Sequence, residues 1–253
     1  MIAIISPAKT LDPSPGKTEY HTQPIFLNEA ARLISSLKKI KPGTLMQLMD
    51  ISDKLAKQNV LRYKAFNKSH TAENSKPALL TFKGDVYLGL KADSFDDSDL
   101  NFAQDHIRIL SGLYGILRPL DLMQEYRLEM GTELTTSRGK NLYEFWGDKI
   151  TKALNDSIKT QKEEYVINLA SQEYWKAVQP KKLKAKVIQV DFHEERDGKI
   201  SFVSFNAKKA RGMMCHFIIK NRLSSPESLK AFDYDGYYFS EHLSGPDHFR
   251  FLK

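Results

Sequence analysis

The stretch HIRILSGLYGILRPLD, residues 106–121, decides the interpretation of the fold. It begins as a short apolar run, as in a buried strand, and the run stops at Ser111-Gly112. A second glycine, Gly115, follows, and then the cationic Arg118. Small, hydroxylated and cationic residues directly after a buried strand indicate either a tight structural turn or the floor of a site that binds an anion.

Similar apolar, β-branched runs recur along the chain, and most are separated by segments with helical spacing. The runs are 2–5, 78–82, 106–110, 165–169, 187–192 and 200–205. Strands that alternate with helices are typical of an α/β fold. The last two runs flank Asp197-Gly198, a strong signal for a β-hairpin turn. We therefore predict a mixed α/β fold with a central sheet of parallel and antiparallel strands.

The region 25–68 is predicted to be helical. A first helix shows an apolar stripe, and Lys41-Pro42-Gly43 ends it. Two shorter helices are expected to follow. The stripe consists of Leu27, Ala30, Ala31, Ile34 and Leu37; the second helix carries Leu45, Leu48 and Met49; the third carries Leu55, Ala56, Val60 and Tyr63. We expect residues 1–253 to form a single domain, with 25–68 as a helical insertion after the first strand.

The segment LMDISDKLAKQNV, residues 48–60, has the shape of a helix-hairpin-helix turn. Ile51 would be the apolar plug, Ser52 can cap the next helix, and Lys54 lies beside them. Such a turn presents backbone N–H groups that suit a backbone phosphate. The usual glycines are missing and Asp50 is negative, so an ordinary helical hairpin is an equal alternative. The surrounding cations favour phosphate: Lys38, Lys39, Lys41, Lys54, Lys57, Arg62 and Lys64.

Several of the predicted strands end in the same way, with a small polar residue or glycine followed by a lysine, tyrosine or arginine. The pairs are Ser6 with Lys9, Asp85 with Tyr87, Ser111 with Arg118, and Ser171 with Tyr174. If these strands are parallel, the pairs converge at the carboxyl edge of the sheet, where ligands of α/β proteins generally bind.

Two further segments add charge to this edge. MQEYRLEMGT, residues 123–132, mixes Tyr126, Arg127 and Glu129 without helical order. NAKKARGMM, residues 206–214, places cations at the start of a helix, where they oppose the helix dipole unless an anion is bound there. Taken singly, the glycines can serve turns, and Arg127 with Glu129 can form a buried ion pair.

Taken together, these features predict a basic, aromatic-lined cleft. Ser111 and Gly112 would let the backbone approach an anion, and two arginines, Arg118 and Arg127, would neutralise it. Three tyrosines would stack on bases. The candidate cleft residues are Lys9, Tyr87, Ser111, Gly112, Arg118, Tyr126, Arg127, Ser171, Tyr174, Lys208 and Arg211.

Composition limits the remaining classes. The net charge of +7 permits a polyanionic partner without establishing one. The single Cys215 excludes internal disulfides and multi-cysteine zinc sites, and it fits the cytoplasm. No apolar window is long enough for a membrane span, and no basic leader precedes the first strand. Walker, Rossmann, HExxH and GxSxG motifs are absent, a metal site at His193 and Glu195 is disfavoured, and we expect no cofactor.

Six motifs resemble the YaaA peroxide-stress protein family over essentially the full chain. They are SPAKTL at 6–11, FKGDVYLGL at 82–90, ILSGLYGILRPLDLMQEYRLEMGT at 109–132, LYEFWGD at 142–148, NLASQEYWK at 168–176 and KKARGMM at 208–214. The resemblance implies a bacterial cytoplasmic protein that limits peroxide damage linked to free iron. It also implies a mixed α/β "cantaloupe" fold with a helix-hairpin-helix element, a positively charged cleft and DNA binding. It supplies no catalytic residues.

Two functions fit these expectations. The first is a monomeric DNA-binding protein that holds duplex or distorted DNA in the cleft through phosphates, without sequence preference. The second is an enzyme acting on a nucleobase or nucleotide in the same cleft. Its candidate groups are Asp121, Tyr126, Arg127, Glu129 and Lys208. A deep pocket lined by a carboxyl group of raised pKa would favour the enzyme, and an open groove would favour the binder.

Overall fold

The computed structural model describes residues 1–12, 14 and 20–253, and a central sheet organises them. The strand order is β11-β12-β9-β8-β1-β5-β6, and β10 pairs with β9. The strands are β1 (Ile2–Ile5), β5 (Ile107–Ser111), β6 (Gly115–Leu117), β8 (Tyr165–Asn168), β9 (Lys186–Arg196), β10 (Lys199–Ser201), β11 (Tyr238–Phe239) and β12 (His248–Leu252). From β12 to β5 all neighbours are parallel, whereas β6, β10 and β11 pair in antiparallel fashion. The predicted mixed sheet is confirmed.

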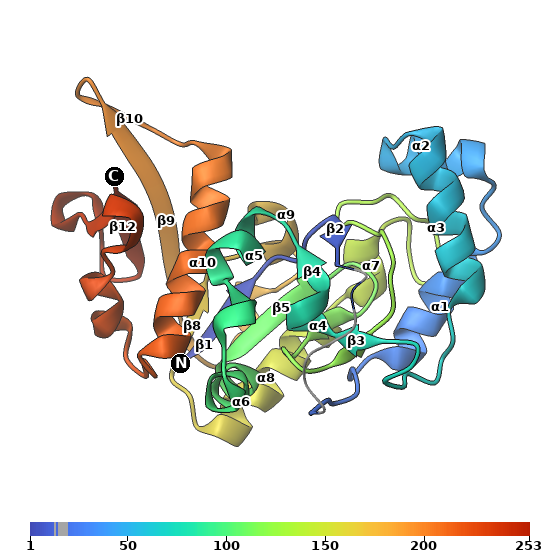
Figure 1. Cartoon of the computed structure of the whole chain (residues 1–253), viewed down its shortest axis with the longest axis horizontal. Helices are drawn as coiled ribbons and strands as arrows, with labels where there is room; N and C mark the ends of the chain where they lie inside the picture. Colours follow the sequence, from blue (N-terminus) through green and yellow to red (C-terminus); the bar gives the residue numbers. More distant parts are fainter. Residues whose placement is uncertain (13, 15–19) are drawn as a thin grey trace.

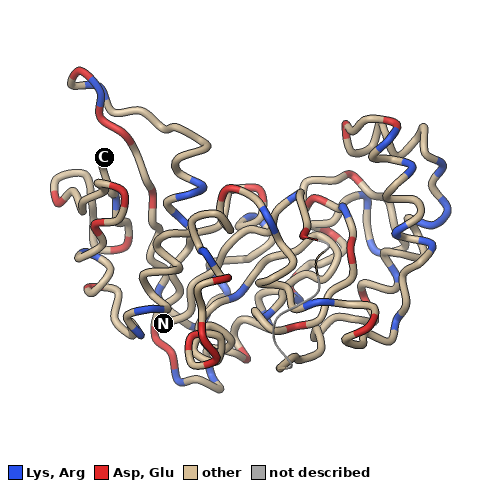
Figure 2. The backbone as a smooth tube through the Cα atoms, in the orientation of Figure 1, with Lys and Arg blue, Asp and Glu red and all other residues tan. Residues whose placement is uncertain are grey.

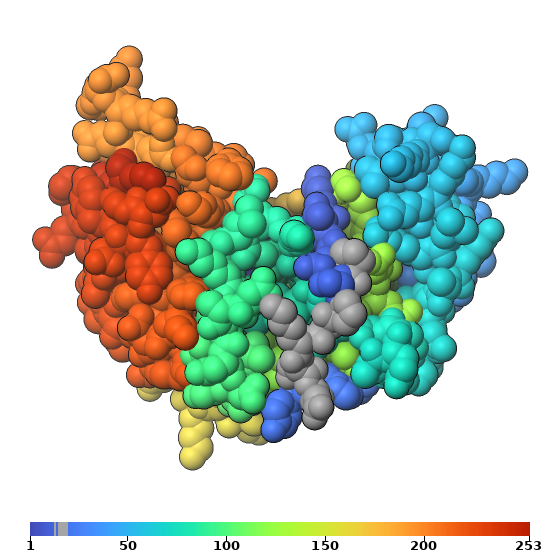
Figure 3. Space-filling view, viewed as in Figure 1, coloured from blue at the N-terminus to red at the C-terminus, as the bar shows by residue number. Residues whose placement is uncertain are grey.

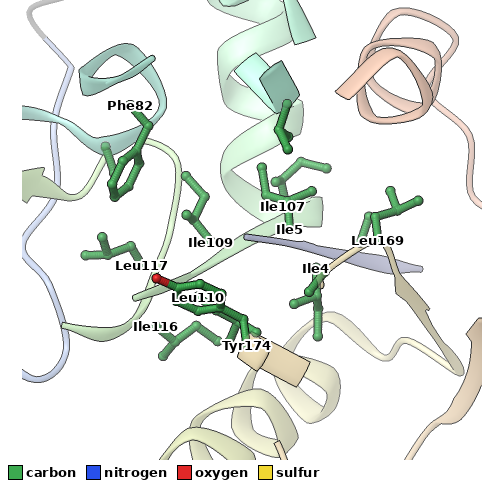
Figure 4. Close-up of a cluster of buried hydrophobic side chains, with 14 of the residues drawn as sticks. Ile4, Ile5, Phe82, Ile107, Ile109, Leu110, Ile116, Leu117, Leu169 and Tyr174 are labelled. Atoms are coloured by element: carbon green, nitrogen blue, oxygen red, sulfur yellow. The ribbon is translucent and has the colours of Figure 1, made fainter. Parts of the chain in front are cut away.

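Strand β1 lies in the middle of the sheet and is buried along its whole length. Ala3 is in register with Ile107 of β5 on one side and with Ile167 of β8 on the other. A parallel strand covered on both faces reads as a continuous apolar run, which is what Ile2–Ile5 shows. Figure 4 shows Ile4 and Ile5 among the side chains of β5 and β6 that build this core.

Two of the predicted strands are corrected by the structure. Residues 78–82 form a short helix, α4 (Ala78–Thr81), followed by the two-residue strand β4 (Phe82–Lys83). Pro77 sets the extended backbone before the helix, and the Thr81 hydroxyl donates to the Pro77 carbonyl at 2.8 Å. The run 200–205 is also broken, because β10 ends at Ser201 and helix α10 begins at Ser204.

The hairpin signal at Asp197-Gly198 is confirmed. Asp197 and Gly198 have φ values of 51° and 71°, the left-handed pair that a two-residue hairpin requires. Ile200 lies opposite Glu195 in the antiparallel ladder of β9 and β10. In Figure 1 this hairpin projects beyond the body of the molecule.

The three helices predicted in 25–68 are confirmed as α1 (Leu27–Leu37), α2 (Pro42–Met49) and α3 (Asp53–Ala65). In the apolar stripe of α1, Ala30, Ile34 and Leu37 are buried, whereas Leu27 and Ala31 are half-buried. Pro42 occupies the first turn of α2, where proline is tolerated because that N–H needs no helical partner. The helices stand together at the end of the molecule opposite the hairpin (Figure 1).

Helix α10 (Ser204–Lys220) crosses α5 (Asp85–Leu90) at close range. The crossing depends on a glycine from each helix. A Cβ on Gly212 would lie 1.7 Å from the Val86 carbonyl oxygen, and one on Gly89 would lie 2.0 Å from the Lys209 carbonyl oxygen. The first turns of α10 are thereby held beside the start of α5.

The remaining elements complete the two faces of the sheet and its edges. They are β2 (Thr10–Leu11), β3 (Lys76–Pro77), β7 (Leu122–Met123), α6 (Asp97–His106), α7 (Leu142–Trp146), α8 (Lys149–Gln161) and α9 (Gln172–Trp175), with short 3-10 helices at Ala92–Ser94, Pro180–Lys182, Pro226–Ala231, Tyr234–Gly236 and Glu241–Leu243. Among the described residues, no helix has the length and apolar character needed to cross a membrane.

Candidate functional site

A broad hollow separates two projecting parts of the molecule, as Figure 3 shows. Helices α1–α3, which we call the helical wall, form one side of the hollow. The β9–β10 hairpin and the start of α10, which we call the hairpin wall, form the other. Elements β2, α5 and α9 lie between the two walls (Figure 1).

A pocket of about 290 Å³ lies at the carboxyl edge of the sheet, below this hollow. It is lined by the loop after β1, the start of α5, the loop after β8 and the first turns of α10. Its charged lining residues are Lys9, Lys83, Asp85, Glu129, Glu173, Lys208 and Arg211. The expected convergence at the carboxyl edge is thus seen for Ser6 with Lys9 and for Ser171 with Tyr174, and Asp85 joins them from α5. The lining is mixed in charge rather than uniformly basic.

Two serines hold the floor of the pocket together. The Ser6 hydroxyl lies 3.2 Å from the Ser171 hydroxyl and accepts the Ser171 backbone N–H at 2.9 Å. The Tyr87 hydroxyl donates to the Ser6 carbonyl at 3.2 Å. Because β1 and β8 are parallel neighbours, their ends bring these two loops side by side.

One side of the pocket is an ion-pair network centred on Glu129. Lys9 Nζ lies 2.7 Å from one carboxylate oxygen of Glu129, and an Arg127 guanidinium nitrogen lies 3.0 Å from the other. Arg127 is largely buried, and its carbonyl accepts the Tyr63 hydroxyl of α3. Arg127 and Glu129 therefore form the ion pair that was one of the two interpretations of this segment. Through the hydrogen bond from Tyr63, the same segment connects α3 to the pocket.

The opposite side of the pocket carries cations with weaker partners. Lys208 Nζ is 4.0 Å from Asp85, and Lys83 Nζ is 4.0 Å from Asp12. Arg211 has no hydrogen bond or ion pair within the described part of the chain, and its Nε is enclosed. Burial lowers the pKa of the Arg211 guanidinium, and the charge of Asp191 partly opposes this shift.

The predicted base-stacking tyrosines are enclosed by protein. Tyr87, Tyr126 and Tyr174 are each less than 10% exposed, at 7%, 5% and 8%. Burial raises the pKa of all three phenols. The Tyr126 hydroxyl shares a 2.6 Å hydrogen bond with Ser111, which is itself buried. Burial leaves little of these rings available for stacking on bases, and Tyr174 is the one of the three that lines the pocket.

Two other predicted residues serve the fold where the structure places them. Gly112 allows the chain to pass closely, since a Cβ there would lie 2.2 Å from the Leu128 carbonyl oxygen. Arg118 does not join the pocket, because β6 runs antiparallel to β5 and returns the chain to the opposite edge of the sheet. There its guanidinium bonds Asp121 at 3.0 Å.

The turn between α2 and α3 matches part of the sequence expectation. Asp50 adopts the left-handed conformation with φ of 48°, and Ser52 caps α3 by accepting the Leu55 N–H at 3.4 Å. The Ile51 N–H donates back to the Met46 carbonyl at 3.1 Å, which satisfies a donor that a phosphate would need. Lys54 is exposed beside this turn.

Positive charge is concentrated on the helical wall. Residues 25–68 contain nine lysine or arginine residues and three acidic residues, in a chain with a net charge of +7. Figure 2 shows how many of the basic positions fall on α1–α3. Only Lys57 and Arg62 of the nine form ion pairs within the described residues, with Asp53 and Glu125. The others are exposed: Arg32, Lys38, Lys39, Lys41, Lys54, Lys64 and Lys68.

Exposed apolar side chains mark the hairpin wall. Ile200, Phe202 and Phe205 are 47%, 54% and 55% exposed. The sequence interpretation did not single them out, because it treated the run 200–205 only as the second strand of the hairpin. The available signal was the hairpin itself, since a two-stranded hairpin without a third strand beside it leaves apolar side chains uncovered.

Binding of a metal or reaction with peroxide would each require particular side chains. Among the described residues, no three His, Cys, Asp or Glu side chains gather as potential metal ligands. His193 and Glu195 lie near the end of β9, and the His193 ring packs edge-on against Phe202 at 6.1 Å. Cys215 is fully buried in α10, and burial raises the pKa of its thiol, which favours the unreactive protonated form.

The sequence model of the family described as "Peroxide stress protein YaaA" matches residues 1–243. The match covers both walls of the hollow and the whole pocket.

Proposed function

The chain belongs to the family of the peroxide stress protein YaaA and has a role in oxidative stress, and we propose that it acts there by binding DNA in the hollow between the helical wall and the hairpin wall. The helical wall would bind phosphates, including through the exposed Lys54 beside the α2–α3 turn, and the hairpin wall would contact bases. Of the candidate cleft residues, Lys9, Ser171, Tyr174, Lys208 and Arg211 line the pocket, which would lie beneath the bound strand without being part of the phosphate-binding surface.

The observation that carries this proposal is the charge of the helical wall. Seven of its cations are exposed without an ion-pair partner among the described residues, so they are available to neutralise phosphates. Side chains that only solubilised the protein would not need such an excess of one sign over a single structural unit. Contacts of this kind position DNA without reading its sequence, which fits a protective protein.

The hairpin wall supplies the second kind of contact. Phe202 follows β10 and Phe205 lies in the first turn of α10, so both belong to the hairpin wall, and both rings are exposed. Aromatic side chains stack on unpaired bases of any sequence, and each stacked base contributes about 1–3 kcal/mol. This arrangement favours distorted or single-stranded DNA over a regular duplex.

Binding of this kind would also explain how the protein protects DNA from peroxide. DNA held between the two walls would be covered on two sides, and damage to it by iron and peroxide would be reduced. We propose that the protein does this as a monomer in the cytoplasm, where its single buried cysteine stays reduced.

The proposal is tested by fluorescence anisotropy with labelled duplex, bulged and single-stranded DNA of one sequence across a salt titration. We expect affinity to fall steeply with salt and to be higher for bulged and single-stranded DNA than for the duplex. Absence of binding near physiological salt, or binding that does not depend on salt, would refute the proposal.

An enzyme acting on a nucleobase or nucleotide is the second candidate, and the pocket is the observation that favours it. Asp121 has a pKa raised by burial, as a general acid would need, but it lies outside the pocket and bonds Thr22 at 2.6 Å. Among the candidate acids and bases, Glu129 and Lys208 line the pocket. Mass spectrometry of bulged DNA and of nucleotides after incubation with the protein would detect the reaction, and unchanged substrates would exclude it.

A further inference from the structure

We propose that the pocket at the carboxyl edge binds a small phosphate monoester, of about the size of a mononucleotide, and that Arg211 is its principal anion-binding residue. This site goes beyond the proposed DNA surface. Its volume of about 290 Å³ is near the lower end for small-molecule sites and is far too small for a duplex.

The first argument is topological. From β1 the chain continues to β5 on one side, whereas from β8 it continues to β9 and then β12 on the other side. The strand order therefore reverses between β1 and β8. Ligands of open α/β sheets bind in the crevice that such a reversal leaves outside the carboxyl ends of the strands. Ser6 and Ser171 follow directly after these two strands and lie in that crevice.

The second argument is the state of Arg211. Its Nε is enclosed and has no hydrogen-bond partner, although a buried polar group without a partner costs about 1–3 kcal/mol, and more if it is charged. The side chain lines the pocket from α10, which the Gly89 and Gly212 crossing holds in place. A planar guanidinium is suited to bind two oxygens of one phosphate at once.

The third argument is that neighbouring groups are free to join Arg211. Lys208 and Lys83 each lie 4.0 Å from their nearest acidic partner, whereas Lys9 lies 2.7 Å from Glu129. The loosely paired lysines can turn toward a bound anion at little cost. The Ser6 hydroxyl donates to the Ser171 hydroxyl at 3.2 Å, and the Ser171 hydroxyl can in turn donate to the same anion.

The acidic residues of the pocket define the rest of the ligand. Glu129 and Glu173 line it together with the cations, and Glu173 accepts only one hydrogen bond from the described chain at its side chain, from the Gly131 N–H at 2.9 Å. Carboxylates repel a bare dianion but accept hydrogen bonds from hydroxyl or amino groups. A molecule with a phosphate at one end and such donors at the other satisfies both sets, and a nucleotide has this chemistry.

The proposal is tested by isothermal titration calorimetry with dAMP and with deoxyadenosine, which lacks the phosphate. We expect dAMP to bind at least tenfold more tightly than the nucleoside, and Arg211→Met to remove at least tenfold of the dAMP affinity. Arg211→Lys should recover part of it. The matched control is Arg196→Met, which removes a largely exposed arginine from the hairpin and should bind dAMP like the wild type.

Equal binding of dAMP and deoxyadenosine, no binding of either, or an unchanged affinity of Arg211→Met would overturn the proposal. If Arg211→Met does not fold, as judged by circular dichroism, Ser171→Ala takes its place and is expected to weaken dAMP severalfold. A 5′-phosphorylated single strand, compared with the same strand without the phosphate, tells whether the phosphate belongs to a strand end or to a free nucleotide.

This test is separate from that of DNA binding. Arg211→Met should leave the affinity for an unphosphorylated duplex and its salt dependence unchanged, because the exposed lysines of the helical wall remain. Failure of the pocket proposal would therefore leave the proposed DNA surface intact. Likewise, absence of DNA binding would leave the proposed phosphate site in the pocket intact.

Discussion

The two walls of the hollow differ in the kind of side chain that they expose. The helical wall, residues 25–68, has nine cations against three acids, whereas the segment 186–209 of the hairpin wall has five cations against four acids. The hairpin wall instead exposes Ile200, Phe202 and Phe205. Charge recognises the phosphates of a nucleic acid and aromatic rings recognise its bases. The difference between the walls therefore indicates how a strand would be oriented between them, with its backbone toward α1–α3.

The largest effect should come from separating the hairpin wall from the body of the protein. Gly212→Ala would place a Cβ 1.7 Å from the Val86 carbonyl, so α5 and α10 must move apart. Helix propensity alone would make this change stabilising by about 1 kcal/mol. We expect instead a destabilisation of about 3 kcal/mol or more, measured by chemical denaturation. Gly43→Ala is the matched control, since nothing lies within 4 Å of that position, and it should be neutral or slightly stabilising.

The helical wall is tested by removing three exposed charges, with Lys38→Gln, Lys39→Gln and Lys41→Gln combined. If all three contact phosphates, the slope of log K against log salt should fall by about 2–3, because each phosphate contact contributes about 0.9 for a duplex. Affinity near physiological salt should fall at least tenfold, and anisotropy measures both quantities.

The matched control for that variant is the combination Lys181→Gln, Lys182→Gln and Lys184→Gln, which changes the net charge by the same amount. These exposed lysines precede β9, at the amino edge of the sheet and away from the hollow. A similar loss of affinity in both variants would mean that net charge, and not the helical wall, determines binding.

The hairpin wall should matter for the choice of substrate. Phe202→Ala combined with Phe205→Ala removes two exposed rings, so folding stability should change little. We expect the affinity for single-stranded or bulged DNA to fall about tenfold while duplex affinity changes less than threefold, because stacking requires unpaired bases. Equal losses on all substrates would show that the two walls do not divide phosphate and base contacts between them.

The sequence predicted best those parts of the fold that depend on local patterns. The buried strand β5 and the Asp197-Gly198 hairpin were recognised because apolar runs and a two-residue turn each carry their own signal. Residues 78–82 have the composition of a strand, but Pro77 and the Thr81 hydroxyl favour a helical turn. Composition alone could not distinguish the two.

The candidate site was predicted less completely, because its geometry depends on pairings that are distant in sequence. Ser6 and Ser171 meet only because β1 and β8 are neighbours, and Arg118 leaves the site because β6 is antiparallel. Residue type also misleads about exposure. Tyr126 is amphipathic and could face either solvent or core, and its hydrogen bond to Ser111 holds it inside. Phe202 belongs to an apolar run that was predicted as a strand, and it lies at the surface.

The smallest expected effect concerns the base of the helical wall. His70 is buried just after α3, where its ring nitrogens lie 2.9 Å from the Tyr114 hydroxyl and 3.3 Å from the Gln124 side-chain nitrogen. Burial lowers the pKa of His70 below its usual value of 6.5. The unfolded chain then binds the proton more readily than the folded one, so stability is retained above pH 6.5 and declines as the pH falls from there toward the folded pKa.

The variant His70→Asn should flatten this decline in thermal melts between pH 7.5 and 5.5, whereas the exposed His242→Asn should not. If the loss of stability also loosens the helical wall, the wild type should lose duplex affinity over the same range while its contacts to single strands through the hairpin wall persist.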